Sequence, residues 1–529
     1  MKKNKLRKKL MLVGMCLSMF AFSACKQKTD GADGTIVEIS LSDAQIDVDG
    51  KEVGSNTSDA VYVANDIIYY EAGKDFSYGE GTEDDAHETE EALNHTVVHI
   101  TQPGTYRVTG KLSKGQIAVD LGENAKDDPE AVVTLILNGA DVTCQVAPAV
   151  IFYSVYECGS GDVDNASNDI DTQTAGANII IADDTVNTMN GSYVAKIYDA
   201  ESVILNDDET EVIDASKLHK YDGAVYSKMS MNVDGEEKGS GVLNINAENE
   251  GLDTELHLTI NGGNININSG NDGINTNEDN VSVTTINGGT LTISVNGKTG
   301  EGDGIDSNGW LVINGGNVIA QACSDSADAG IDSDMGIYIN GGTVIASGHM
   351  LDRIEDGGQT YAVFNFSQKQ AGGKTLSLKN ESDTTLLDIC PDNEYSVLIY
   401  SSPELVSGTY TLWNDDTKLS SQGGIVGSPG MEGMNPEGME PPEGMEIPEG
   451  AEGMEPPEGM EIPEGAEGME PPEGMEMPEE IEGMEPPEDG VRPDKPGQEM
   501  ENFENPDNTQ ERIYEFQINQ GANMFSGIG

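Results

Sequence analysis

The chain has 529 residues, a formal net charge of −67 and 64 glycines, but only 9 phenylalanines and 2 tryptophans. Nucleic-acid binding needs a basic face, so this charge excludes nucleic-acid binding proteins and favours cations as partners. The shortage of aromatic residues is unusual for a conventional mixed core and compatible with a solenoid of narrow stacked coils.

The N-terminus has the pattern of a bacterial lipoprotein signal. A basic segment ends at Lys9, and an apolar segment from Leu10 to Phe22 follows. That segment is too short to span a bilayer as a helix, which is typical of a signal peptide. Because small residues precede Cys25, we predict a signal peptide over residues 1–24 and lipidation of Cys25. The protein would then be extracytoplasmic and lipid-anchored to the bacterial cell membrane. Ordinary secretion with an unmodified cysteine is the alternative.

Residues 25–95 form a polar leader, and short β-branched runs separated by turn signals begin at Thr96. No segment shows sustained helical periodicity, so we predict an all-β chain. Two polar insertions interrupt the pattern, at Gly159–Ala177 and Gly191–Lys220.

A repeat with a clear register occupies residues 222–347. Each copy ends in Asn-Gly-Gly, and the asparagines are separated by 26, 27 and 26 residues: Asn261, Asn287, Asn314 and Asn340. A unit of this length fits one coil of a right-handed, single-stranded parallel β-helix, which we place at residues 96–347. The apolar pairs before each asparagine should stack inside, and the asparagines should form an inner amide ladder. The glycines should supply the positive φ that the corners need.

Three further segments follow the repeat. Residues 348–427 contain alternating runs that predict an antiparallel β cap on the last coil. Residues 428–509 repeat a Pro-, Glu-, Met- and Gly-rich unit, which predicts a disordered insertion. Residues 510–529 contain a final strand pattern that should dock on the cap.

The acidic turns of the repeat are the candidate site. In register, they place acidic or amide residues in columns whose members are about 5 Å apart. Stacked carboxylates repel one another and raise each other's pKa, and Ca²⁺ resolves this because it accepts six to eight oxygen ligands. The expected ligands are Asp303, Asp306, Asp328, Asp332 and Asp334, followed by Asp272 and Asn275. The alternative is that these are solvated turn residues.

Enzymatic motifs are scarce. Asp303 and Asp306 could act as paired carboxylates, but the same pattern recurs on neighbouring coils, whereas a catalytic pair should be unique. A lyase would need calcium and a basic residue, for which Lys298 is the candidate. The four cysteines beyond Cys25 lack metal spacing; we expect buried fillers, although Cys144 and Cys158 could bridge.

The pattern resembles the carbohydrate-binding β-helix family of bacterial surface lipoproteins. The resemblance extends from Thr96 to Gly529, and its motifs are QPGTYRVTGKLSKGQIAVD (Gln102–Asp120), TLILNGADVT (Thr134–Thr143), IIIADDTVNT (Ile179–Thr188), the DGAVYS, DGINT and DGIDS coils, and YSSPELVSGTYTLW (Tyr400–Trp413). It implies a β-helix similar to a calcium-dependent pectate lyase family, bound calcium, and binding of cellulose and acidic plant polysaccharides without clear lyase activity.

We therefore predict a non-catalytic, calcium-containing polysaccharide-binding protein on the cell surface. Its ligand would be cellulose or an acidic polysaccharide such as polygalacturonate. A calcium-dependent lyase with a Lys base and a structural adhesin are the alternatives.

Overall fold

The computed structural model describes residues 35–426 and 512–529. The predicted signal peptide, Cys25 and the repeat at 428–509 lie outside the described residues. Strands account for 47% and helices for 2% of the structure, so the prediction of an all-β chain is confirmed. Three short helical segments are present among the described residues: α1 (Thr89–Ala92) and 3₁₀ turns at Ala125–Asp127 and Val163–Asn165.

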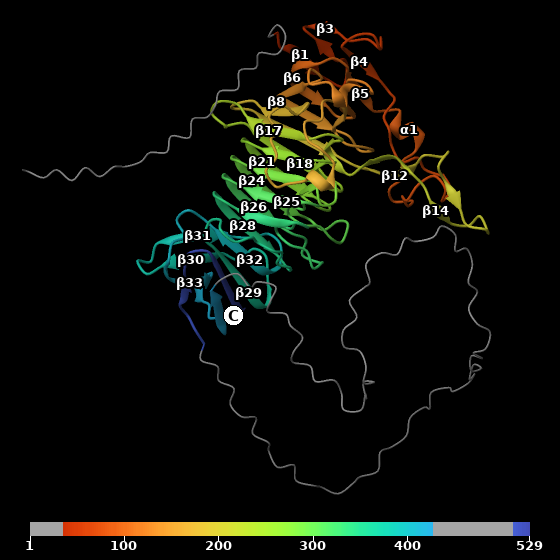
Figure 1. The fold of residues 1–529 in the computed structure, drawn as a ribbon. Coiled ribbons are helices and arrows are strands. Elements are labelled where there is room, and N and C mark those ends of the chain that lie inside the picture. Colours follow the sequence, from red (N-terminus) through yellow and green to blue (C-terminus); the bar gives the residue numbers. More distant parts are fainter. Residues whose placement is uncertain (1–34, 427–511) are drawn as a thin grey trace, which may run out of the picture. The chain divides into compact units, whose positions relative to one another are not determined.

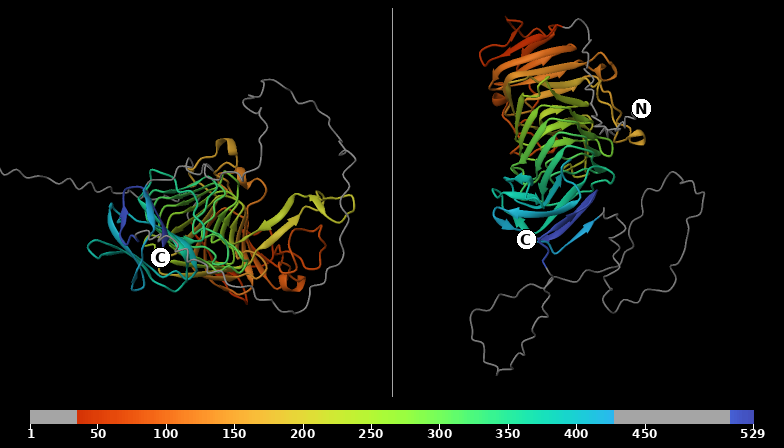
Figure 2. Two further views of the ribbon diagram at one scale, coloured as in Figure 1. Left: turned by 90° about the horizontal axis from the view of Figure 1, so that it is seen from below. Right: turned by 90° about the vertical axis from the view of Figure 1, so that its left-hand side faces the viewer.

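Three ladders of parallel strands build the repeat region, and they stack in chain order in Figures 1 and 2. The first ladder contains β1 (Val37–Leu41), β6 (Gly104–Leu112), β8 (Val133–Thr143), β10 (Ala177–Ile181), β17 (Met231–Gly235), β20 (Leu258–Ile260), β23 (Val283–Ile286), β25 (Trp310–Ile313) and β27 (Gly336–Ile339). The second continues from β8 through β11 (Val186–Gly191), β18 (Val242–Ala247), β21 (Asn264–Ser269), β24 (Thr290–Val295), β26 (Asn317–Gln321) and β28 (Thr343–Gly348). The third contains β5 (Thr96–Ile100), β7 (Gly115–Asp120), β9 (Val150–Ser154), β16 (Gly223–Ser227), β19 (Glu250–Thr254) and β22 (Ile274–Thr276).

The apolar pairs of the repeat stack inside, as the sequence predicts. Ile260 pairs with Ile286, Ile286 with Ile313, and Ile313 with Ile339. Each of these side chains is at most 1% exposed. Side chains alternate between the two faces of a strand, so one inward residue per coil is enough to build a continuous apolar column.

The predicted amide ladder exists, but it lies outside the coils. Asn287 donates to Asn261 over 2.9 Å, Asn314 to Asn287 over 3.0 Å, and Asn340 to Asn314 over 2.9 Å, always from Nδ2 to Oδ1. All four asparagines are exposed. The prediction of an inner ladder is wrong because each asparagine directly follows an inward isoleucine, and alternation turns its side chain outward.

The second glycine of each Asn-Gly-Gly bends the chain between the first and second ladders. Gly263, Gly289, Gly316 and Gly342 have φ between 82° and 88°. A Cβ at Gly289 would lie 2.6 Å from the Gly263 carbonyl oxygen one coil earlier. Both the positive φ and the close stacking therefore require glycine, as the repeat predicts.

A short N-terminal segment and a hairpin flank the coils. The N-terminal strands are β2 (Asp47–Val48), β3 (Lys51–Glu52) and β4 (Val61–Ala64), which pairs antiparallel with β5. The insertion after Gly191 folds into an antiparallel pair, β12 (Val194–Tyr198) with β15 (Lys217–Tyr221), and a smaller pair, β13 (Ile204–Leu205) with β14 (Val212–Asp214). The β12–β15 hairpin, yellow in Figure 2, extends to one side of the coils.

Strands that pair mostly antiparallel follow the last coil. They are β29 (Tyr361–Gln370), β30 (Leu376–Asn380), β31 (Thr385–Ile389), β32 (Tyr395–Ser401), β33 (Gly408–Asn414), β34 (Thr417–Lys418), β35 (Gly423–Val426), β36 (Phe516–Ile518) and β37 (Ala522–Ile528). β32 pairs antiparallel with β28, so it ends the parallel ladder. β36 pairs antiparallel with β33, whereas β37 pairs parallel with β29 and antiparallel with β35. A second apolar core lies between these strands.

The described cysteines are all free. Cys144 and Cys323 are buried, Cys158 is half-buried and Cys390 is exposed, so the prediction of four buried fillers is wrong for Cys158 and Cys390.

Candidate functional site

The acidic columns arise from the register of the third ladder. β19 pairs with β22 so that Asp253 lies opposite Asn275, and the Ile274–Ile305 bridge carries the same register to Asp306. Leu252, Ile274 and Ile305 are fully buried in the coil interior. The residues that follow them therefore face the other side of the strand, in one column.

Three of the predicted calcium ligands converge in what we call the Asp303 cluster. One carboxylate oxygen each of Asp303, Asp306 and Asp332 lies within 4.8 Å of the other two. Among the described residues, none of the three forms an ion pair with a basic side chain. Burial and the charge of Asp272 raise the pKa of Asp303 to about 9. Burial and neighbouring carboxylates also raise the pKa of Asp306 to about 6 and that of Asp332 to about 7.

The other predicted ligands have different surroundings. Asp272 is 8% exposed and accepts a hydrogen bond from the Asp303 amide over 2.7 Å. Burial, Glu250 and Asp306 raise the pKa of Asp272 well above its usual range. Asp328 instead accepts from the Gly302 amide over 2.6 Å and from the Ser326 hydroxyl, which ties it to the turn. Asp334 is exposed, and Asn275 belongs to the next cluster.

A second convergence, the Glu250 cluster, contains Asp222, Glu250 and Asp253, whose ligand atoms also lie within 4.8 Å of one another. Glu250 is 5% and Asp253 0% exposed. Burial and the charges of neighbouring carboxylates, Asp222 among them, raise the pKa of both carboxyls well above their usual range.

Two oxygens of the Glu250 cluster and one of the neighbouring Asn275 are buried without a hydrogen-bond partner: Glu250 Oε2, Asp253 Oδ2 and Asn275 Oδ1. Asn275 Nδ2 donates to the other Glu250 oxygen, Oε1, over 3.1 Å. This hydrogen bond uses the amide nitrogen and leaves the amide oxygen, Oδ1, without a partner. A buried acceptor without a partner costs free energy, so it suits a ligand that supplies positive charge. The donor set contains only oxygens, as hard cations require.

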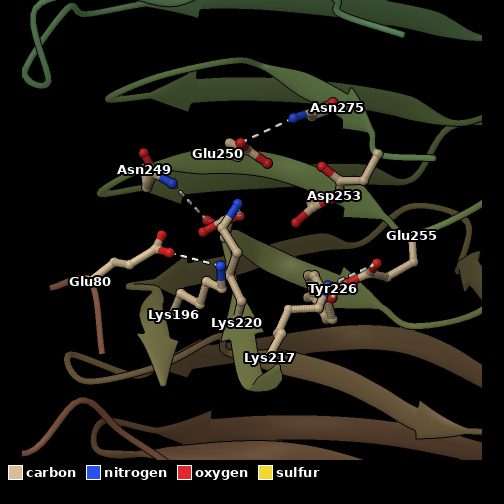
Figure 3. Close-up of polar contacts among 12 residues, drawn as sticks. Glu80, Lys196, Lys217, Lys220, Tyr226, Asn249, Glu250, Asp253, Glu255 and Asn275 are labelled. Atoms are coloured by element: carbon tan, nitrogen blue, oxygen red, sulfur yellow. Dashed lines mark hydrogen bonds and ion pairs between the residues drawn. The ribbon is translucent and has the colours of Figure 1, made fainter. Parts of the chain in front are cut away.

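The hairpin brings lysines to this cluster. Lys220 Nζ lies 2.6 Å from Asp222 Oδ2, and Lys217 Nζ lies 2.9 Å from Glu255 Oε1. In Figure 3 the Glu250 and Asp253 side chains face a common space, and Lys220 extends toward them. The Glu250 cluster therefore has an internal cation that the Asp303 cluster lacks.

Lys298 lies elsewhere. Its Nζ is 3.4 Å from Glu248 Oε1, and its side chain is 64% exposed. The lysine that contacts an acidic cluster is Lys220, which sequence reasoning did not select. Asp222, Glu250 and Asp253 were not predicted as ligands either, although Glu250 occupies the same column as Asp272 and Asp303, and Asp253 pairs with Asn275. The place of Lys220 depends on how an irregular insertion folds, and no repeat signal covers it.

A family model described as carbohydrate-binding domain-containing protein matches residues 94–384, more than half of the chain. The chain belongs to this family. Both acidic clusters lie inside the matched range of the carbohydrate-binding domain-containing family. No curated protein matches the chain.

One solved structure is similar to the chain, and its title reads "Structure of the polysaccharide lyase-like protein from C. thermocellum, Gadolinium derivative". The identity is 19% and the TM-score 0.31, over 58% of this chain and 84% of that chain.

Proposed function

We propose that the protein binds polysaccharide at the cell surface, holds calcium in its acidic clusters and does not cleave its ligand. The family to which the chain belongs is described as carbohydrate-binding, which supports the ligand class. The observation that carries the calcium proposal is the convergence of carboxylates together with unpartnered buried oxygens beside them.

Calcium suits both clusters because it accepts carboxylate and amide oxygens in flexible geometry. Asp303, Asp306 and Asp332 would hold one ion. Glu250, Asp253 and Asn275 would hold another, with Asp222 shared between it and Lys220. Bound calcium would supply positive charge that balances the carboxylates and can bridge to the carboxylates of an acidic polysaccharide.

The scaffold of this proposal is a right-handed parallel β-helix. The three parallel ladders and the coil length of the repeat support it. Such crossover connections between parallel strands are right-handed in nearly all proteins.

We also propose that lipidated Cys25 anchors the protein outside the cytoplasm. The support is the basic segment, the short apolar segment and the small residues before Cys25. Among the described residues, no helix is long and apolar enough to cross a membrane.

The position of Lys220 beside the Glu250 cluster raises a second candidate function, a lyase with a Lys base. A base must lose its proton near the working pH. Burial alone would lower the pKa of Lys220, but the Asp222 charge and hydrogen bond raise the pKa above its ordinary value. This ion pair favours a protonated Lys220 and therefore the binding function.

The test is retention on insoluble cellulose and on immobilised polygalacturonate, with calcium and with EDTA. We expect binding in calcium and no release of unsaturated uronate, which is followed by its ultraviolet absorbance. A time-dependent rise in that absorbance would establish the lyase instead. Absence of binding to any glycan in either condition would exclude the proposed function and favour an adhesin.

A further inference from the structure

The outward residues of four consecutive strands of the second ladder form a surface without charge, which we call the neutral face. The strands are β11, β18, β21 and β24, with the sequences VNTMNG, VLNINA, NININS and TLTISV. The second and fourth residues of each strand are buried, so the first, third and fifth face outward. Every outward residue is Val, Asn, Thr or Ser.

These residues form straight columns. Thr188 pairs with Asn244, Asn244 with Asn266, and Asn266 with Thr292. Neighbouring strands lie about 4.8 Å apart, so like groups recur at that interval along the stack. This interval is comparable with the advance per sugar unit of an extended polysaccharide.

The groups are chemically suited to hydroxyls. An amide or a hydroxyl both donates and accepts hydrogen bonds, as a sugar hydroxyl does. Asn266 Nδ2 donates to Asn244 Oδ1 over 2.9 Å, which fixes the amide orientation within the column. An amide nitrogen has two hydrogens, and this bond uses one of them.

The neutral face differs from the rest of the molecule in carrying no charged residue. Charged residues make up 23% of the chain, and its net charge is −67. Charged pairs lie at the borders of this face: Lys111 with Asp141, which pairs with Thr188 from the preceding strand β8, Lys238 with Asp184 before β11, and Lys298 with Glu248 beyond the strand ends. An acidic polymer would find no cation on this face, whereas an uncharged polymer binds it without desolvating an ion.

We propose that the neutral face binds an uncharged, extended polysaccharide whose chain follows the stacked coils. The proposal rests on the carbohydrate-binding function proposed above and assigns one ligand class to one surface. Acidic polysaccharide is left to the calcium clusters on the third ladder.

The test uses the full-length protein and two probes, an insoluble uncharged β-glucan and polygalacturonate, both in calcium. Asn266→Glu/Thr292→Glu places two carboxylates on adjacent strands at the centre of the face. We expect the affinity for the β-glucan to fall by about tenfold, because burying an unpaired charge is costly. The affinity for polygalacturonate should be unchanged. Thr292→Val keeps the shape and removes one hydroxyl; we expect a loss of about threefold.

Thr385→Glu is the matched control, since Thr385 is exposed on β31 of the cap. It should bind both probes like the wild type, and melting temperatures should confirm that all variants fold. Polygalacturonate binding without β-glucan binding by the wild type would overturn this inference and leave the proposed function standing. Unchanged β-glucan binding by both face variants would also overturn it. Wild-type protein that binds neither probe would overturn the proposed function itself.

Discussion

The third ladder carries buried carboxylates in columns, while the second carries uncharged amides and hydroxyls on the same coils. Both faces are repeated outward positions over one apolar interior, so folding alone does not explain their difference. Carboxylates with raised pKa values oppose stability near neutral pH, whereas the amides bond along their columns. The carboxylates of the third ladder therefore indicate a ligand that balances their charge, and the neutral face indicates an uncharged ligand.

Removal of calcium by a chelator should give the largest difference between the two faces. If calcium is present at about 100 times its dissociation constant, its removal lowers the free energy of unfolding by about 3 kcal/mol per site. Urea unfolding with and without EDTA measures the loss. The Thr292→Val variant should lose the same amount as the wild type, because its substitution lies on the other ladder. An unfolding midpoint that EDTA leaves unchanged would contradict calcium at either cluster.

The effect of Asp306→Asn on the free energy of unfolding should have opposite signs without and with calcium. At pH 8 without calcium, the variant should be more stable than the wild type by about 1 kcal/mol, because it removes repulsion from Asp334 and Asp352. With calcium it should be less stable, since a ligand charge is lost. Asp416→Asn, an exposed residue of the cap, is the control and should shift stability equally in both conditions. If Asp306→Asn changed stability in the same direction in both conditions, Asp306 would not be a calcium ligand.

The sequence predicts part of the contrast between the two faces. The spacing of Asn261, Asn287 and Asn314 fixed the coil length, and the register brought Asp303, Asp306 and Asp332 together. The predicted side of the asparagine ladder is wrong because strict alternation along the strand, and not the turn preference of asparagine, decides where the side chain points.

The Glu250 cluster was less accessible to sequence reasoning. Its partner Lys220 comes from an insertion whose fold has no periodic signal, so its ion pair with Asp222 emerges only in three dimensions. The buried oxygens of Asp253 and Asn275 depend on the same packing. Repetition is predictable from sequence, and the irregular segments that cover a repeat are not.

The pH dependence should sharpen the comparison. The pKa of Asp303 is about 9 and that of Asp332 about 7, both above the ordinary value of 3.8. Between pH 4 and these values, the folded protein holds more protons than the unfolded chain, so stability without calcium falls as pH rises. Calcium should reverse this trend, because it binds the deprotonated carboxylates. Melting temperatures from pH 5 to 9 test this, and a calcium-free melting temperature that rises across this range would contradict it.

Asn314→Ala should have a small effect on stability, and that effect should depend least on calcium and pH. Asn314 donates to Asn287 and accepts from Asn340, so the substitution removes two exposed hydrogen bonds and should cost about 1 kcal/mol. Because amides do not titrate, the loss should be the same at pH 5 and pH 8 and with or without EDTA. Thr385→Ala on the cap gives the baseline for an exposed substitution. If the Asn314→Ala loss instead followed calcium, the asparagine ladder beside the first ladder of strands and the acidic columns would share one energetic unit, and their contributions to stability could not be separated.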